Sequence, residues 1–116
     1  MVMESEISRA PKPEIVFEEN LQKFNELVEL GKQPDLRNAN LSGLDLRKAK
    51  LTGLDLSGCY LRGANLSGLD LSGCNLHGAS LRGARISGVL FPANVSAEEI
   101  RLSVDFGTRI RVRNDG

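Results

Sequence analysis

The residues best suited to metal or nucleophilic chemistry are His77, the single histidine, and the two cysteines, Cys59 and Cys74. A structural zinc site uses four such ligands, and no second cysteine pair or further histidine accompanies these three. No serine lies in a nucleophile elbow, and the chain has no phosphate-binding loop and no dinucleotide fingerprint. The sequence therefore predicts a protein that is not an enzyme and that has no metal, no cofactor and no structural disulfide.

The positions of these residues follow a repeat of five that runs without a gap over residues 34–93. The centre of every unit is large and apolar, and a second apolar or small residue stands two positions before it in each unit. Glycine stands two positions after the centre in nine of the twelve units. The predicted core consists of the twelve centres, Leu36, Leu41, Leu46, Leu51, Leu56, Leu61, Leu66, Leu71, Leu76, Leu81, Ile86 and Phe91.

A period of five fits neither a helix nor a simple strand, so a repeat architecture is considered first. The two apolar positions of a unit alternate as in a short strand and face one side. Glycine supplies a positive φ after them, and Asn or Asp before the centre can bond to the nearby backbone. Each unit thus predicts a short extended edge and a corner, and four units close one coil. Cys59 and Cys74 stand two positions before a centre, so we expect both to point inward.

Several units share one motif, in which an alanine is followed by Asp or Asn and then by leucine. Residues 39–43 (Ala-Asn-Leu-Ser-Gly) and 64–68 (the same five residues) match it directly, and residues 54–58 and 74–78 match with a changed first residue. In this the sequence resembles the pentapeptide repeat family, in particular its short bacterial members with an N-terminal helix and a C-terminal tail. The resemblance implies a β-solenoid, a right-handed quadrilateral β-helix of three coils. A leucine-rich repeat is the alternative fold, but its units of about 20–29 residues are too long for this spacing.

The segments outside the repeat predict caps. Residues 1–13 predict a flexible leader. Apolar residues such as Leu21 and Phe24 then recur at helical spacing, which predicts an N-terminal capping α-helix over residues 14–33 that Gly31 can end. A cap is favoured over a partner-docking helix because a solenoid exposes its core and its backbone edges at each end.

Residues 94–116 predict a C-terminal cap and tail. Ser96, followed three residues later by Glu99, has the pattern of a capping box, and this favours a short helix that ends near Gly107. Alternating apolar residues in the same stretch also fit a strand. Residues 109–113 alternate as well and predict either a final edge strand or a disordered tail.

Stacking at twenty-residue intervals divides the outer surface into four faces. We number the faces one to four by their first centre residues, Leu36, Leu41, Leu46 and Leu51. Face two places Arg62 beside Arg82, with Tyr60 just before Arg62. Stacked like charges repel unless an anion or an acidic partner lies against them. Tyr60, Arg62 and Arg82 therefore form the candidate partner-binding face, and Asp35 stacks on Asp55 in the same way on face one.

The charge balance limits the choice of partner. The chain has 15 basic and 15 acidic residues, and its repeat has seven basic against four acidic residues. This is the profile neither of an acidic mimic nor of a strongly basic nucleic-acid binder. Neither a signal peptide nor an apolar run of about 20 residues is seen, which predicts a cytoplasmic protein without membrane contact.

We therefore expect a non-enzymatic protein-interaction module with an unknown protein partner, acting as a monomer or as a weak dimer through a capped end. The alternative function is a DNA-mimicking regulator of a type II topoisomerase, as in one branch of the family. The basic repeat and the short length disfavour it, because mimicry needs a long acidic rod. The composition also disfavours direct nucleic-acid binding, since Tyr60 is the single tyrosine available for base stacking.

Overall fold

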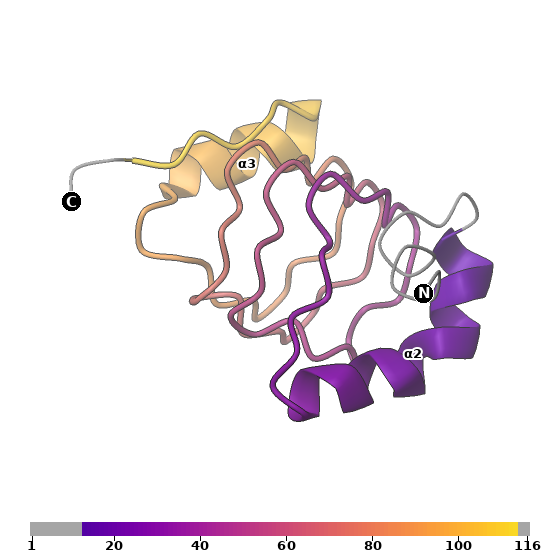
Figure 1. Ribbon diagram of the computed structural model, residues 1–116. Helices are drawn as coiled ribbons and strands as arrows, with labels where there is room; N and C mark the ends of the chain where they lie inside the picture. The colour runs from indigo at the N-terminus through magenta and orange to yellow at the C-terminus, as the bar shows by residue number, and fades with distance from the viewer. Residues whose placement is uncertain (1–12, 114–116) are drawn as a thin grey trace.

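The computed structural model describes residues 13–113, with side chains from residue 21 onward. Two helices flank the repeat, α2 (Pro13–Glu29) and α3 (Ala97–Phe106), and between them the chain forms a stack of turns (Figure 1). The predicted leader, residues 1–13, lies outside the described residues except for Pro13, which begins α2.

α2 ends earlier than predicted. Gly31 adopts a φ of 84°, and its N–H donates to the carbonyl oxygen of Val28 at 3.0 Å. The N–H of Lys32 donates to the carbonyl oxygen of Leu27 at 3.0 Å. This pair of bonds is a Schellman motif, which stops a helix at a left-handed glycine. The prediction that Gly31 ends the helix is confirmed, but the predicted boundary at residue 33 is wrong.

The repeat is held together by backbone contacts between residues twenty positions apart. Parallel bridges join Asn40 to Tyr60 and Tyr60 to Ser80. The N–H of Leu41 donates to the Tyr60 carbonyl at 2.8 Å, and this bond recurs one coil later from Leu61 to Ser80 at 2.9 Å. Six such bridges are found among residues 13–113, all of them isolated. Each predicted extended edge therefore pairs through single residues and forms no continuous strand.

The corners are stabilised by the side chains that precede each centre. The Asn40 Oδ1 atom accepts a hydrogen bond from the Ser42 N–H at 3.1 Å, and the Asp55 carboxylate accepts one from the Ser57 N–H at 2.9 Å. The same local bond forms at Asp35, Asp45, Asn65, Asp70 and Asn75. The predicted local bonding of Asn and Asp to the backbone is thus confirmed.

The corner glycines are not all equivalent. Gly63 has a φ of 68°, and positive φ values recur at every glycine two positions after a centre except Gly73. The prediction that these glycines supply a left-handed conformation is therefore wrong at Gly73, whose corner turns without it.

The burial of the predicted core residues is most complete from Leu36 to Leu81. The ten leucine centres are at most 3% exposed. Ile86 and Phe91, the last two predicted core residues, are only partly buried. They lie on faces three and four of the last coil, beyond which the repeat does not continue. Both therefore pack against the core without being fully buried, because no further coil within the described residues covers them.

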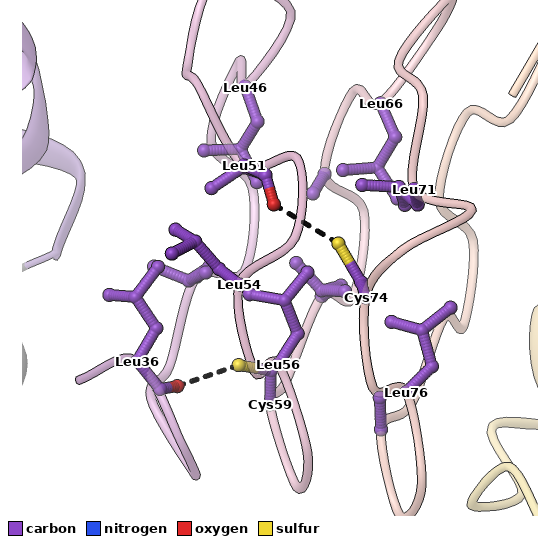
Figure 2. Close-up of a cluster of buried hydrophobic side chains, with 14 of the residues drawn as sticks. Leu36, Leu46, Leu51, Leu54, Leu56, Cys59, Leu66, Leu71, Cys74 and Leu76 are labelled. Carbon is purple, nitrogen blue, oxygen red and sulfur yellow. Dashed lines mark hydrogen bonds between the residues drawn. The ribbon is translucent and has the colours of Figure 1, made fainter. Parts of the chain in front are cut away.

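Cys59 and Cys74 point into the core, as predicted, and both are free thiols. Their sulfur atoms donate to backbone carbonyls of the preceding coil (Figure 2), Cys59 to Leu36 at 2.8 Å and Cys74 to Leu51 at 3.1 Å. Burial raises the pKa of Cys59 to about 12 and also raises the pKa of Cys74. Both cysteines are therefore protonated core residues at neutral pH.

Neither α2 nor α3, the helices of the described chain, combines the length and the apolar character that crossing a bilayer requires.

Candidate partner-binding face

The predicted binding residues Tyr60, Arg62 and Arg82 line one open depression on face two. We call it the face-two depression, and its volume is about 500 Å³. Its lining residues are Asn40, Ser42, Tyr60, Arg62, Ser80, Arg82, Phe106 and Gly107. The structure thus brings all three candidate residues together, and it adds the end of α3 as a wall of the depression.

The backbone register explains why the two arginines are neighbours. The Gly43 N–H donates to the Arg62 carbonyl at 2.8 Å. One coil later, the Gly63 N–H donates to the Arg82 carbonyl at 2.8 Å. Successive coils therefore stack residue on residue at the ~4.8 Å spacing of paired strands. Two like charges are held side by side on this face by the fold itself.

Arg82 also supports α3. Its Nη1 atom donates to the carbonyl oxygen of Phe106 at 3.4 Å. Its aliphatic chain packs so closely on Gly107 that a Cβ atom there would lie 3.1 Å from the Arg82 Cδ. A cation at the C-terminal end of a helix is stabilised by the helix dipole. The interpretation of Arg82 as a purely partner-binding residue was therefore incomplete, because it also holds the end of α3.

Tyr60 is held by Arg109, a residue that sequence reasoning placed in the tail. The Arg109 guanidinium lies 4.7 Å from the centroid of the Tyr60 ring, and its Nη2 atom donates to the Tyr60 hydroxyl at 2.6 Å. Its Nη1 atom donates to the Gly78 carbonyl at 2.7 Å. Tyr60 nevertheless stays 42% exposed. The depression therefore contains an aromatic ring whose position is fixed.

Arg62 gives the depression a positive charge that can pair with a ligand. It is exposed, and its guanidinium forms neither a hydrogen bond nor an ion pair with any residue of the described chain. No acidic residue lines the depression, whereas Phe106, which is 66% exposed, adds apolar surface. This combination suits an anionic group attached to a partly apolar chain.

The other candidate groups are occupied locally. Arg37 pairs with Asp35 through its Nε and Nη2 atoms at 2.9 and 3.0 Å, so the acidic stack predicted on face one is partly neutralised. The Val112 N–H donates to His77 Nδ1 at 3.5 Å, which ties His77 to the C-terminal segment. Within residues 21–113, no three His, Cys, Asp or Glu side chains gather as metal ligands do.

Ser96 is the N-cap of α3, but the reciprocal bond of a capping box, from the Ser96 N–H to the Glu99 carboxylate, is not formed. Ser96 accepts a hydrogen bond from the Glu99 N–H at 3.1 Å, and α3 ends with Gly107 at a φ of 77°, so the predicted helix is confirmed. The Glu99 carboxylate, however, accepts hydrogen bonds from the Arg111 N–H and Nε, each at 3.0 Å. Arg111 thereby lowers the pKa of Glu99. The capping glutamate is used to hold the segment after α3.

That segment lies against the last coil of the stack. The Ile110 N–H donates to the Ala79 carbonyl at 2.9 Å, and the Ile110 carbonyl accepts from the Gly78 N–H at 2.7 Å. Ile110 itself is 1% exposed. Residues 109–113 are thus neither a disordered tail nor an assigned strand, but an extended segment that pairs with the end of the stack. Their alternating pattern was the sequence signal for this pairing.

The match to known families agrees with this geometry. A model of pentapeptide repeats matches residues 35–53 and 55–91 in eight copies. The chain belongs to the pentapeptide repeat family. The pentapeptide repeat match covers the stack and leaves out α2, α3 and the segment with Arg109 and Arg111. No curated protein and no solved structure gives a match.

Proposed function

We propose that this pentapeptide repeat protein is a non-enzymatic protein-interaction module, and that its face-two depression binds an acidic segment of a partner protein. The observation that carries the proposal is Arg62, an exposed cation without a partner among the described residues, in a depression of about 500 Å³ that no acidic residue lines. Complementary charge across an interface mainly supports fast association and selection against wrong partners.

Two of the side chains that line the depression are held in place by other parts of the chain, and this favours binding without rearrangement. Tyr60 is fixed by Arg109, and Arg82 is fixed by the end of α3. Both lie on coils whose backbones are bonded to their neighbours. Side chains that are ordered before binding lose less conformational entropy when a partner arrives. The exposed Phe106 beside them offers the apolar contact that an interface centre needs.

The alternative of DNA mimicry finds less support. It requires a continuous negative surface, but Asp35 is paired with Arg37 and Asp45 is paired with Arg47 at 2.7 Å. The face-three column of outward residues, which begins with Asp45, continues with Asn65 and Arg85. These pairings interrupt the negative charge on faces one and three.

We further infer that the stack is the right-handed quadrilateral β-helix of three coils that the family resemblance implies. The twenty-residue register of the bridges supports this inference, since four units of five residues close one coil. An experimental structure with four corners per coil and a right-handed path is the expected result, and any other coil shape or hand would contradict it.

Capture of partners on the immobilised full chain tests the proposed function. The native chain is compared with Arg62→Glu and with Arg101→Glu, a matched reversal of an exposed arginine on α3 that does not line the depression. We expect a protein from a lysate of the source cells to be retained by the native chain and by Arg101→Glu, and to be lost with Arg62→Glu. Equal retention by Arg62→Glu would show that the face-two depression is not the binding site.

A further inference from the structure

The face-three edge of each coil binds the next coil through the same backbone groups. The Ala64 carbonyl accepts a hydrogen bond from the Arg85 N–H at 2.9 Å, and the Leu66 N–H donates to the Arg85 carbonyl at 2.9 Å. The Gly68 N–H then donates to the Ser87 carbonyl at 2.8 Å. One coil later the equivalent groups are the Ala84 carbonyl, the Ile86 N–H and the Gly88 N–H, which we call the open edge.

None of these three groups has a hydrogen-bond partner within residues 21–113. The contrast with face two of the same coil is direct. There the Leu81 N–H donates to the Ser103 Oγ at 2.8 Å, and the Gly83 N–H donates to the Val104 carbonyl at 3.0 Å. α3 thus takes the place of a next coil on face two, whereas the three groups on face three stay unpaired within residues 21–113.

The side chains at the open edge are also incompletely covered. Ile86 is only partly buried, whereas Leu46 and Leu66, its counterparts in the preceding coils, are 0% and 1% exposed. Arg85 is exposed, and its guanidinium has no partner within the described residues. An apolar contact and a free charge therefore lie beside the three unpaired backbone groups.

We propose that the open edge binds an extended segment of a partner protein, paired in parallel register as a further coil would be. Its backbone bonds to Ala84, Ile86 and Gly88, a large apolar residue covers Ile86, and an acidic residue just before that one lies over Arg85. The spacing of the unpaired groups selects an extended backbone, because a helix satisfies its own N–H and carbonyl groups. Arg85 selects the acidic residue, since opposite charges stabilise neighbouring strands. This site is independent of the face-two depression.

A fluorescein-labelled decapeptide made of two copies of Ala-Asp-Leu-Ser-Gly is a suitable probe, measured by fluorescence anisotropy with the full chain. We expect saturable binding that Arg85→Glu weakens about tenfold and that Arg101→Glu, a reversal of an exposed arginine on α3, leaves unchanged. A peptide with Lys in place of Asp should recover binding to Arg85→Glu. Methylation of the peptide's Asp amide nitrogens removes the N–H that bonds to Ala84, so it should abolish binding.

Several results would overturn the proposal. These are an absence of saturable binding, equal binding of the N-methylated peptide, or equal binding to Arg85→Glu. Sedimentation at increasing concentration tests a second copy as the occupant, and a dimer that Arg85→Glu abolishes would assign the edge to self-association. Binding only to a chain that lacks residues 1–12 or 114–116 would assign the edge to the chain's own ends.

Discussion

At the scale of single residues, substitutions at Gly63 and Gly73 distinguish the effect of backbone conformation on stability from the effect of side-chain packing. A Cβ atom added at Gly63 meets no atom within 4 Å, but the φ of 68° there is unfavourable for any L side chain. We expect Gly63→Ala to lower the free energy of unfolding by about 1–2 kcal/mol. Gly73→Ala is the control, since its Cβ would be 3.6 Å from the Gly53 Cα, an ordinary contact, without a positive φ. Equal losses of stability in urea unfolding would contradict the account of the corners.

Cys59 makes a testable contribution to the pH dependence of stability. Its folded pKa of about 12 lies above its ordinary value, so the folded state retains the proton more tightly than the unfolded state. The stabilisation is complete below about pH 8.5 and is lost as the pH rises toward the folded pKa. Between pH 8.5 and 10, the native chain should lose about 1–2 kcal/mol more stability than Cys59→Ser, which has no thiol to titrate. Parallel losses in the two proteins would show that the thiol is accessible.

At the scale of elements, Ser103 joins α3 to the stack. It is fully buried, and its Oγ accepts the hydrogen bond of the Leu81 N–H at 2.8 Å. Ser103→Ala leaves that buried donor without a partner and should cost about 1–3 kcal/mol. Hydrogen exchange of the Leu81 amide should become faster at the same time. The exposed Ser87→Ala is the control, and an unchanged Leu81 exchange rate in Ser103→Ala would tell against this contact.

α2 covers the first coil through Phe24 and Asn25. Phe24 is 0% exposed, and the Asn25 side chain bonds to the Lys48 carbonyl and the Lys50 N–H, each at 2.9 Å. Phe24→Ala should cost about 3–5 kcal/mol and promote aggregation, because it opens the end of the core. Leu30→Ala removes an apolar side chain that is 74% exposed and serves as the control. A stable, monomeric Phe24→Ala variant in thermal melting and light scattering would show that α2 is not a cap.

Sequence reasoning was strongest where the repeat is regular. The inward positions of Cys59 and Cys74 and the role of Gly31 in stopping α2 follow from local patterns of spacing and turn chemistry. The contacts of the C-terminal segment do not follow from such patterns. Arg109 bonds to Tyr60 across 49 positions of sequence, and the five-residue period that relates other distant residues stops before Arg109. The partial burial of Ile86 likewise depends on which faces that segment covers.

At the scale of the whole molecule, the fold presents two separate surfaces around a fixed stack. The face-two depression combines Arg62 with the ring of Tyr60, and the open edge combines Arg85 with unpaired backbone groups. α2 covers the first coil, and α3 together with the segment after it covers face two of the last coil. We propose an acidic partner for both surfaces, but an extended partner backbone for the open edge alone.

Photo-crosslinking in the source cells tests the central claim most directly. The photoreactive residue p-benzoylphenylalanine replaces Ser42 in the face-two depression or, as the control, the exposed Thr52 on face four. The account predicts a protein adduct from position 42 that maps to an acidic segment of the partner, that disappears when Arg62→Glu is added, and that does not form from position 52. An adduct that forms from position 52 but not from position 42, or one from position 42 that persists with Arg62→Glu, would contradict it.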